Sequence, residues 1–371
     1  MPSSISSFRS SFFGRARLRL RRIAVARPSF FLSALLLLGV TTATAIGLAS
    51  GAQVLYHPRP LAPDPGAVAS SDHFLAIFGN SHFEAGIDPN ALAVNLSATP
   101  GSVKAQMFDG GGWDALHYYM LALLARDVLR PEKDVVVIEV SPTSLNDSQT
   151  SNRLGVIRPE TATAIARVAG MPTETRLDVL FGSVATLYRY RTSFQSALQL
   201  RLEGIAQRGA AWLGRLGLLG APPHAPPFEL KIAPGRDFVI EQVLGDRAAF
   251  LQASKLKAEN FVSSLHTGGF KLAALEQAIR VLRERNIAVV LVEPPESNWY
   301  EATLLAGPFG VRHRDLVRGI ADRTGATYLS EWRPALRENE LFWDGVHMVA
   351  TATPGFTSAL ALELQDRRVL R

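Results

Sequence analysis

The sequence predicts an α/β protein, a three-layer α/β/α sandwich in which helices cover both faces of a parallel sheet. Two apolar runs, His73–Gly79 and Asp134–Val140, have the length and composition of buried strands. Between them, Asp114–Leu129 places its apolar residues at helical spacing, and Pro131 follows directly. Strand, helix and strand in this order indicate a parallel sheet, whose ligand site lies beyond the carboxyl ends of the strands.

A further strand is predicted before this helix, at Val103–Phe108, and the run Gly110-Gly111-Gly112 comes soon after it. The alternation of helix and strand resumes near the end of the chain. There the predicted elements are two helices and two strands, in the order Leu272–Asn286, Ile287–Glu293, Val311–Thr324 and Ala326–Leu329. We therefore expect one α/β domain over residues 72–371.

An insertion at about residues 148–268 separates the two halves of this domain, because the segment lacks the alternation of strand and helix. It contains helical patterns at Pro159–Val168, Leu177–Tyr190 and Ser196–Leu218, followed by several prolines. Two interpretations stay open. The inserted helical region caps or flanks the site, or it is a helical elaboration with no part in substrate binding.

The charge of the chain is concentrated at its amino terminus. The first 27 residues carry seven arginines and no acidic residue. Subtracting these seven from the net charge of +6 leaves −1 for the rest. A near-neutral body offers no electrostatic footprint for a phosphate backbone, so the composition argues against a nucleic-acid partner. The chain has no cysteine, which excludes disulfides, thiolate nucleophiles and cysteine-based zinc sites.

The arginine-rich tail precedes a long uncharged segment. Residues 29–56 include Phe30–Tyr56, which is long enough to cross a bilayer, and a transmembrane helix is therefore predicted. The positive-inside rule places residues 1–28 in the cytoplasm and the body of the chain outside it, in the periplasm or its equivalent. Residues 57–71 are proline-rich and predict a spacer. The alternative is a cleaved signal peptide, since Ala43-Thr44-Ala45 offers a small-x-small site.

Two short motifs carry candidate chemistry. Gly79-Asn80-Ser81-His82 follows the first apolar strand, and a serine on such a turn exposes its hydroxyl at the edge of the sheet. Far along the chain, Trp343-Asp344-Gly345-Val346-His347 places an acid three residues before a histidine. A carboxylate at that spacing can orient an imidazole, which in turn activates a serine hydroxyl. Taken alone, Ser81 also fits a serine that caps the following helix. Likewise, Asp344 and His347 taken alone also fit a hydrogen-bonded turn pair.

Together the two motifs resemble the SGNH (GDSL-like) hydrolase superfamily. The order of the membrane segment, GNSH, GIDP, DVVVIEVSP, the insertion and WDGVH is similar to the D-alanyl-transfer and alginate O-acetylation proteins. The resemblance covers about Phe74–Ser144 and Leu272–Leu364. It implies a flavodoxin-like sandwich in which Ser81 is the nucleophile, Asp344 the orienting acid and His347 the base.

The supporting residues follow the family's pattern less closely. Asn80 stands where the superfamily often has aspartate. The oxyanion glycine is one of the three consecutive glycines, and Gly111 is favoured. Asn146 is the nearest match to the family's asparagine block. One missing oxyanion donor would cost about 2.7–4 kcal/mol of transition-state stabilisation.

The resulting prediction is a serine esterase or O-acyltransferase that acts on an acylated cell-envelope glycan or a similar ester. It needs no cofactor and no metal, because His82 with Asp344 and His347 lacks the HxxxH or HxH arrangement of a metal site. His82 and His117 are interpreted as packed or surface histidines. The rival interpretation is a non-catalytic envelope protein that binds glycan or partners a membrane acyltransferase.

Overall fold

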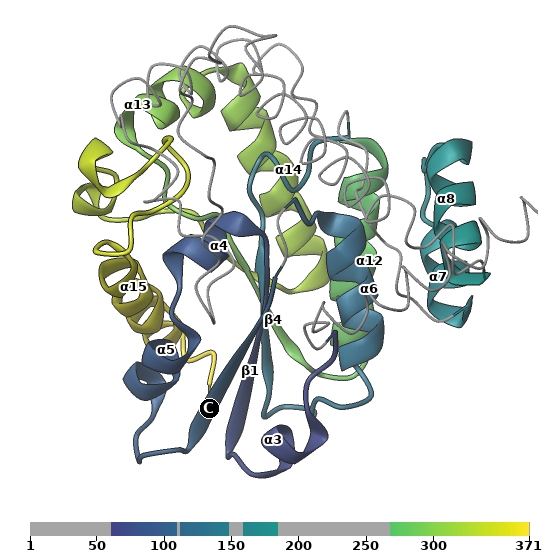
Figure 1. Ribbon diagram of the computed structural model, residues 1–371, viewed down its shortest axis with the longest axis horizontal. Helices are drawn as coiled ribbons and strands as arrows, with labels where there is room; N and C mark the ends of the chain where they lie inside the picture. Colours follow the sequence, from purple (N-terminus) through teal and green to yellow (C-terminus); the bar gives the residue numbers. More distant parts are fainter. Residues whose placement is uncertain (1–60, 110–111, 148–158, 185–267, 371) are drawn as a thin grey trace, which may run out of the picture.

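The computed structural model describes residues 61–109, 112–147, 159–184 and 268–370. In this part of the chain, five parallel strands form one sheet in the order β2-β1-β3-β4-β5 (Figure 1). The strands are β1 (His73–Gly79), β2 (Val103–Asp109), β3 (Val135–Glu139), β4 (Ala288–Val292) and β5 (Thr327–Leu329). The α/β prediction is confirmed, and the strands lie within a residue or two of their predicted bounds.

The three central strands are apolar along nearly their whole length because both of their faces are covered. Alternate residues of one strand enter different cores: Phe74, Ala76 and Phe78 of β1 face one side, whereas Leu75 and Ile77 face the other. All five residues of β3 are buried. Continuous apolar strands of this kind are typical of parallel sheets between two helical layers.

Helices form the two outer layers (Figure 1). The first core lies under α3 (Pro65–Ala69), α6 (Ala115–Ala125), α7 (Pro159–Ala166), α8 (Thr173–Val184), α12 (Gly269–Arg283) and α14 (Pro308–Thr324). The second lies under α4 (Ser81–Gly86), α5 (Pro89–Leu96) and α15 (Thr353–Asp366). Short helical turns complete the last third: α13 (Asn298–Tyr300), η2 (Glu301–Leu305), η3 (Pro334–Leu336) and η4 (Asn339–Leu341).

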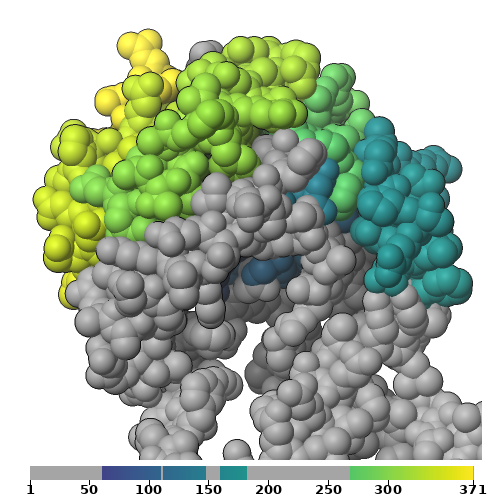
Figure 2. Space-filling view, turned by 90° about the horizontal axis from the view of Figure 1, so that it is seen from above, coloured from purple at the N-terminus to yellow at the C-terminus, as the bar shows by residue number. Residues whose placement is uncertain are grey.

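The strand order reverses direction between β1 and β3, which are neighbours in the sheet. After β1 the chain crosses through α4 and α5 on one face to β2, and then through α6 on the other face to β3. Such a reversal leaves a crevice at the carboxyl ends of the two strands. Figure 2 views the molecule from this end, with α7 and α8 (teal) at the right and the yellow end of the chain at the left.

Several elements differ from the sequence prediction. The second half of the predicted spacer forms α3, and the Val68 side chain of this helix packs into the first core with 3% of its surface exposed. The folded domain therefore begins before residue 72. Helices α5 and α15 were not predicted. No helix among the described residues is long and apolar enough to span a membrane. The predicted anchor at residues 29–56 lies outside the described ranges, as does most of the predicted insertion.

Candidate active site

Ser81 is the first residue of α4, directly beyond the carboxyl end of β1. Asn80 caps this helix from an extended backbone conformation, and its side-chain Oδ1 accepts a hydrogen bond of 2.8 Å from the amide of His82. The turn is tight, because a Cβ on Gly79 would lie 2.6 Å from Cβ of Phe83. Glycine before Asn80 therefore lets the first turn of α4 pack on the end of the strand.

Asp344 and His347 lie on a turn between the η4 segment and α15. The turn is closed by a bridge between Phe342 and Met348, and the amide of Trp343 donates to the carbonyl of His347 at 2.9 Å. Oδ1 of Asp344 accepts hydrogen bonds from the amides of Val346 (3.2 Å) and His347 (2.9 Å). Its Oδ2 lies 2.7 Å from Nδ1 of His347. The carboxylate thus fixes both the turn and the imidazole.

Gly345 lets this turn form. Its φ is +97°, in the left-handed region, and a Cβ there would lie 2.4 Å from Cζ2 of Trp299. The carbonyl of Gly345 also accepts a 2.8 Å hydrogen bond from the amide of Ser297. The acid and histidine are therefore held against the segment that follows β4.

We expect Gly345→Ala to lower the free energy of unfolding by about 1–3 kcal/mol more than Gly101→Ala does. Both glycines have positive φ, but a Cβ on Gly101 meets nothing within 4 Å. The difference between the two variants therefore isolates the overlap with Trp299. Urea unfolding of both proteins measures it, and equal losses would show that Trp299 moves aside without cost.

The two turns meet at the carboxyl end of β1. Nε2 of His347 lies 2.8 Å from Oγ of Ser81, although the residues are 266 positions apart in sequence. Helix α15 holds them together, since Oγ1 of Thr353 donates to the carbonyl of Ala85 (2.8 Å), and the amide of Asp88 donates to Oγ1 of Thr357 (3.1 Å). The result is a continuous chain of hydrogen-bonded groups from carboxylate through imidazole to hydroxyl.

The charges of Asp344 and His347 stabilise one another. Burial would raise the pKa of Asp344, but the hydrogen bonds and charge of His347 outweigh it and lower that pKa to about 2. Burial lowers the pKa of His347, whereas the hydrogen bond and charge of Asp344 raise it, and its net pKa lies above 6.5. Asp344 is therefore ionised at neutral pH and stabilises an imidazolium at His347. This is what a general base beside a serine hydroxyl requires.

A second carboxylate lies beneath the serine turn, and the sequence analysis did not identify it. Glu139, the last residue of β3, is fully buried, and its Oε2 accepts a 2.7 Å hydrogen bond from the amide of Asn80. Burial raises its pKa to about 7, although hydrogen bonds from Asn80 and Ser141 oppose that rise. An acid at the carboxyl end of an otherwise apolar strand was the signal available in the sequence.

The histidines predicted to be packed or at the surface are both buried. His82 is 5% exposed, and its ring meets that of His347 edge to face at a centroid distance of 5.1 Å. Burial and the nearby His347 lower the pKa of His82 to about 3, so it is neutral. His117 is 1% exposed, and Trp113 stacks on its ring. Its Nδ1 lies 2.9 Å from Oδ1 of Asp114, the cap of α6.

The supporting residues are placed only in part. Gly111 lies outside the described residues, while the neighbouring Gly112 has φ of +76° in the loop between β2 and α6. Asn146 is buried in the loop after β3, at the same end of the sheet. Among the described residues, nothing accepts a hydrogen bond from the backbone N–H of Ser81, which lies in the first turn of α4. That N–H is therefore a candidate oxyanion donor.

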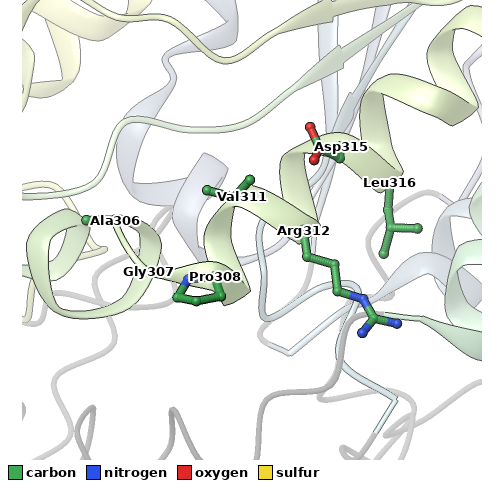
Figure 3. Close-up of a pocket in the computed structure, with 7 residues that line it drawn as sticks. All are labelled: Ala306, Gly307, Pro308, Val311, Arg312, Asp315 and Leu316. Carbon is green, nitrogen blue, oxygen red and sulfur yellow. The ribbon is translucent and has the colours of Figure 1, made fainter.

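A shallow depression at the start of α14 is separate from these residues. Figure 3 shows the side chains that line it, namely Ala306, Gly307, Pro308, Val311, Arg312, Asp315 and Leu316. His313 and Arg314 of the same helix face inward instead, to the carbonyl of Val140 (3.1 Å) and to Glu293 (2.9 Å). The depression lies on the outer side of α14 and contributes nothing to the chemistry at Ser81.

Comparisons with known proteins found distant structural similarities, so the function is inferred from the geometry of the site. No protein-family model matches the chain, and no curated protein matches it. Among solved structures, it is similar to a protein described as an arylesterase from Agrobacterium tumefaciens, with 14% identity, a TM-score of 0.32 and coverage of 79% of this chain and 99% of that one. It is also similar to an alpha/beta hydrolase enzyme from the metagenome of Lake Arreo, with 11% identity and a TM-score of 0.32. That match covers 81% of this chain and 98% of the other. Likenesses this distant carry no argument about function.

Proposed function

We propose that this chain is a serine-dependent esterase or O-acyltransferase of the SGNH type. The observation that supports it is the hydrogen-bonded series Asp344, His347 and Ser81, with heavy-atom distances of 2.7 and 2.8 Å. One of the three residues follows β1, and the other two lie on a turn far along the chain. They meet at the carboxyl ends of the strands, where α/β proteins bind ligands. A capping serine or a stabilising turn requires no such convergence.

The proposed reaction follows the roles of these groups. Oγ of Ser81 attacks the acyl carbonyl while Nε2 of His347 takes the hydroxyl proton, and Asp344 stabilises the resulting imidazolium. The backbone N–H of Ser81, with a donor from the loop after β2, would bind the oxyanion. Collapse of the tetrahedral intermediate expels the alcohol, which receives the proton from His347, and leaves an acyl ester on Ser81. Water or a sugar hydroxyl then accepts the acyl group by the reverse sequence.

The proposed substrate is an acylated glycan of the cell envelope, and the proposed location is the outer face of the plasma membrane. Both follow from the predicted anchor at residues 29–56, its arginine-rich flank and the resemblance to envelope acylation proteins. A membrane acyltransferase that supplies the acyl group is the partner that this resemblance implies.

One experiment tests activity and location together. A charged fluorophosphonate that does not cross membranes is added to spheroplasts producing the full chain, and to their lysate. We expect labelling of one serine, Ser81, in both samples, because only an activated hydroxyl reacts with such a probe. Labelling confined to the lysate would contradict the outer location. An unlabelled protein in both samples would favour the rival function, an envelope protein that binds glycan without catalysis.

A further inference from the structure

Glu139 ties the end of β3 to the turn that carries Ser81. Its Oε2 accepts from the amide of Asn80 at 2.7 Å, and its Oε1 accepts from Oγ of Ser141 at 2.7 Å. The first of these donors directly precedes Ser81 in sequence. The carboxylate therefore fixes the backbone immediately before the candidate nucleophile.

Glu139 also faces the candidate base. Its Oε1 lies 3.6 Å from Nδ1 of His82, and the ring of His82 contacts the ring of His347. His82 is buried and neutral, so it places no positive charge between the two. The charge of Glu139 raises the pKa of His347, and a protonated His347 in turn lowers the pKa of Glu139. Each group favours the charged form of the other.

We propose that Glu139 is a positioning residue, a second carboxylate that holds the serine turn and stabilises the imidazolium of His347 alongside Asp344. This inference rests on the proposed function of the same site. Glu139 makes its hydrogen bonds to Asn80 and Ser141, and it acts through the backbone of Asn80 and through its field at His347.

The pH at which Glu139 ionises then shapes the activity. Burial raises its pKa to about 7, so the side chain is neutral below that pH and charged above it. The other titratable groups that face it are His82 on α4, Tyr118 on α6 and Glu296 after β4. Burial raises the pKa of Tyr118 and of Glu296 well above their ordinary values, which favours the neutral form of both. Glu139 is thus a group whose charge changes in this range and whose field reaches His347.

Two variants reduce the charge at position 139 to different extents. Glu139→Gln removes the charge, so the pKa of His347 falls and the acid limb of the rate of Ser81 labelling moves about one unit lower in pH, with a plateau roughly tenfold lower. Ser141→Ala keeps the carboxylate but removes one hydrogen bond that lowers the pKa of Glu139. Glu139 is then ionised to a smaller extent near neutral pH and raises the pKa of His347 less, so the acid limb also moves to lower pH, by less than in Glu139→Gln. A role confined to folding would lower the plateau of both variants without moving either midpoint.

Nuclear magnetic resonance of the full chain in detergent gives a readout that needs no catalysis. The chain contains eight histidines, and the His347 ring signals are assigned by their loss in His347→Gln. We expect the His347 titration midpoint to fall by about one unit in Glu139→Gln. An unchanged midpoint overturns the inference even where Ser81 is labelled. A shifted midpoint with unlabelled Ser81 supports the electrostatic coupling and contradicts the proposed function instead.

Discussion

Replacing Ser81 by alanine is expected to lower turnover of an acetylated aryl ester by roughly a millionfold, the scale seen when a serine nucleophile is removed. The protein should stay folded. The change deletes one hydrogen bond, between Oγ and Nε2 of His347, at a partly exposed position, which costs about 1 kcal/mol. In cells, the acyl content of the envelope should change as it does when the chain is absent.

Replacing Ser81 by cysteine measures how strongly His347 activates a nucleophile at this position, independently of ester turnover. The chain contains no cysteine, so thiol alkylation of Ser81→Cys reports on position 81 alone. A thiol beside His347 should react as a thiolate well below the ordinary thiol pKa of about 8.5. In the double variant Ser81→Cys, His347→Ala, the thiol should react only near its ordinary pKa. Wild-type turnover in Ser81→Ala at normal protein levels would remove the catalytic proposal.

Asp344→Asn should lower turnover by roughly four orders of magnitude, as the equivalent change does in serine protease triads. Asparagine preserves the shape of the turn and can still accept from the amides of Val346 and His347. It cannot stabilise the imidazolium, and its amide favours the wrong tautomer of His347. Because the charge of Asp344 raises the pKa of His347, the acid limb of the remaining activity should also move to lower pH.

The matched control for this variant is Asp88→Asn. Asp88 caps α5 by accepting from the amide of Asn90 at 2.9 Å, and asparagine caps a helix equally well. Its turnover and midpoint of unfolding should match the wild type. Equal turnover in Asp344→Asn and Asp88→Asn would show that the pairing of Asp344 with His347 serves the turn and not a reaction.

The central strands could be predicted from sequence because burial on both faces leaves continuous apolar runs, as in β1 and β3. The pairing of Ser81 with the Asp344–His347 turn was expected from their positions at strand ends and from the family resemblance. Helix α15 was harder to predict, because it carries little contrast between its two faces while it packs on α4 and α5. Proline in the segment before β1 hid α3, although Asp64 followed by Pro65 is a helix-start signal.

Glu139 shows a different limit of sequence reasoning. Its two hydrogen-bond donors come from Asn80 and Ser141, and the first of these lies 59 residues away in the chain. A single acid in an apolar strand says nothing about which backbone groups will converge on it. The same holds for His82, whose contact with His347 depends on the docking of a segment from the other end of the sequence.

The separation of 266 residues between Ser81 and His347 also sets when the site can exist. Chains are made from the amino terminus at about 5–20 residues per second, so the serine precedes the histidine by roughly 15–50 s of synthesis. Throughout that interval the hydroxyl lacks the base that His347 supplies. A chain stopped before His347 therefore cannot attack esters by the proposed mechanism.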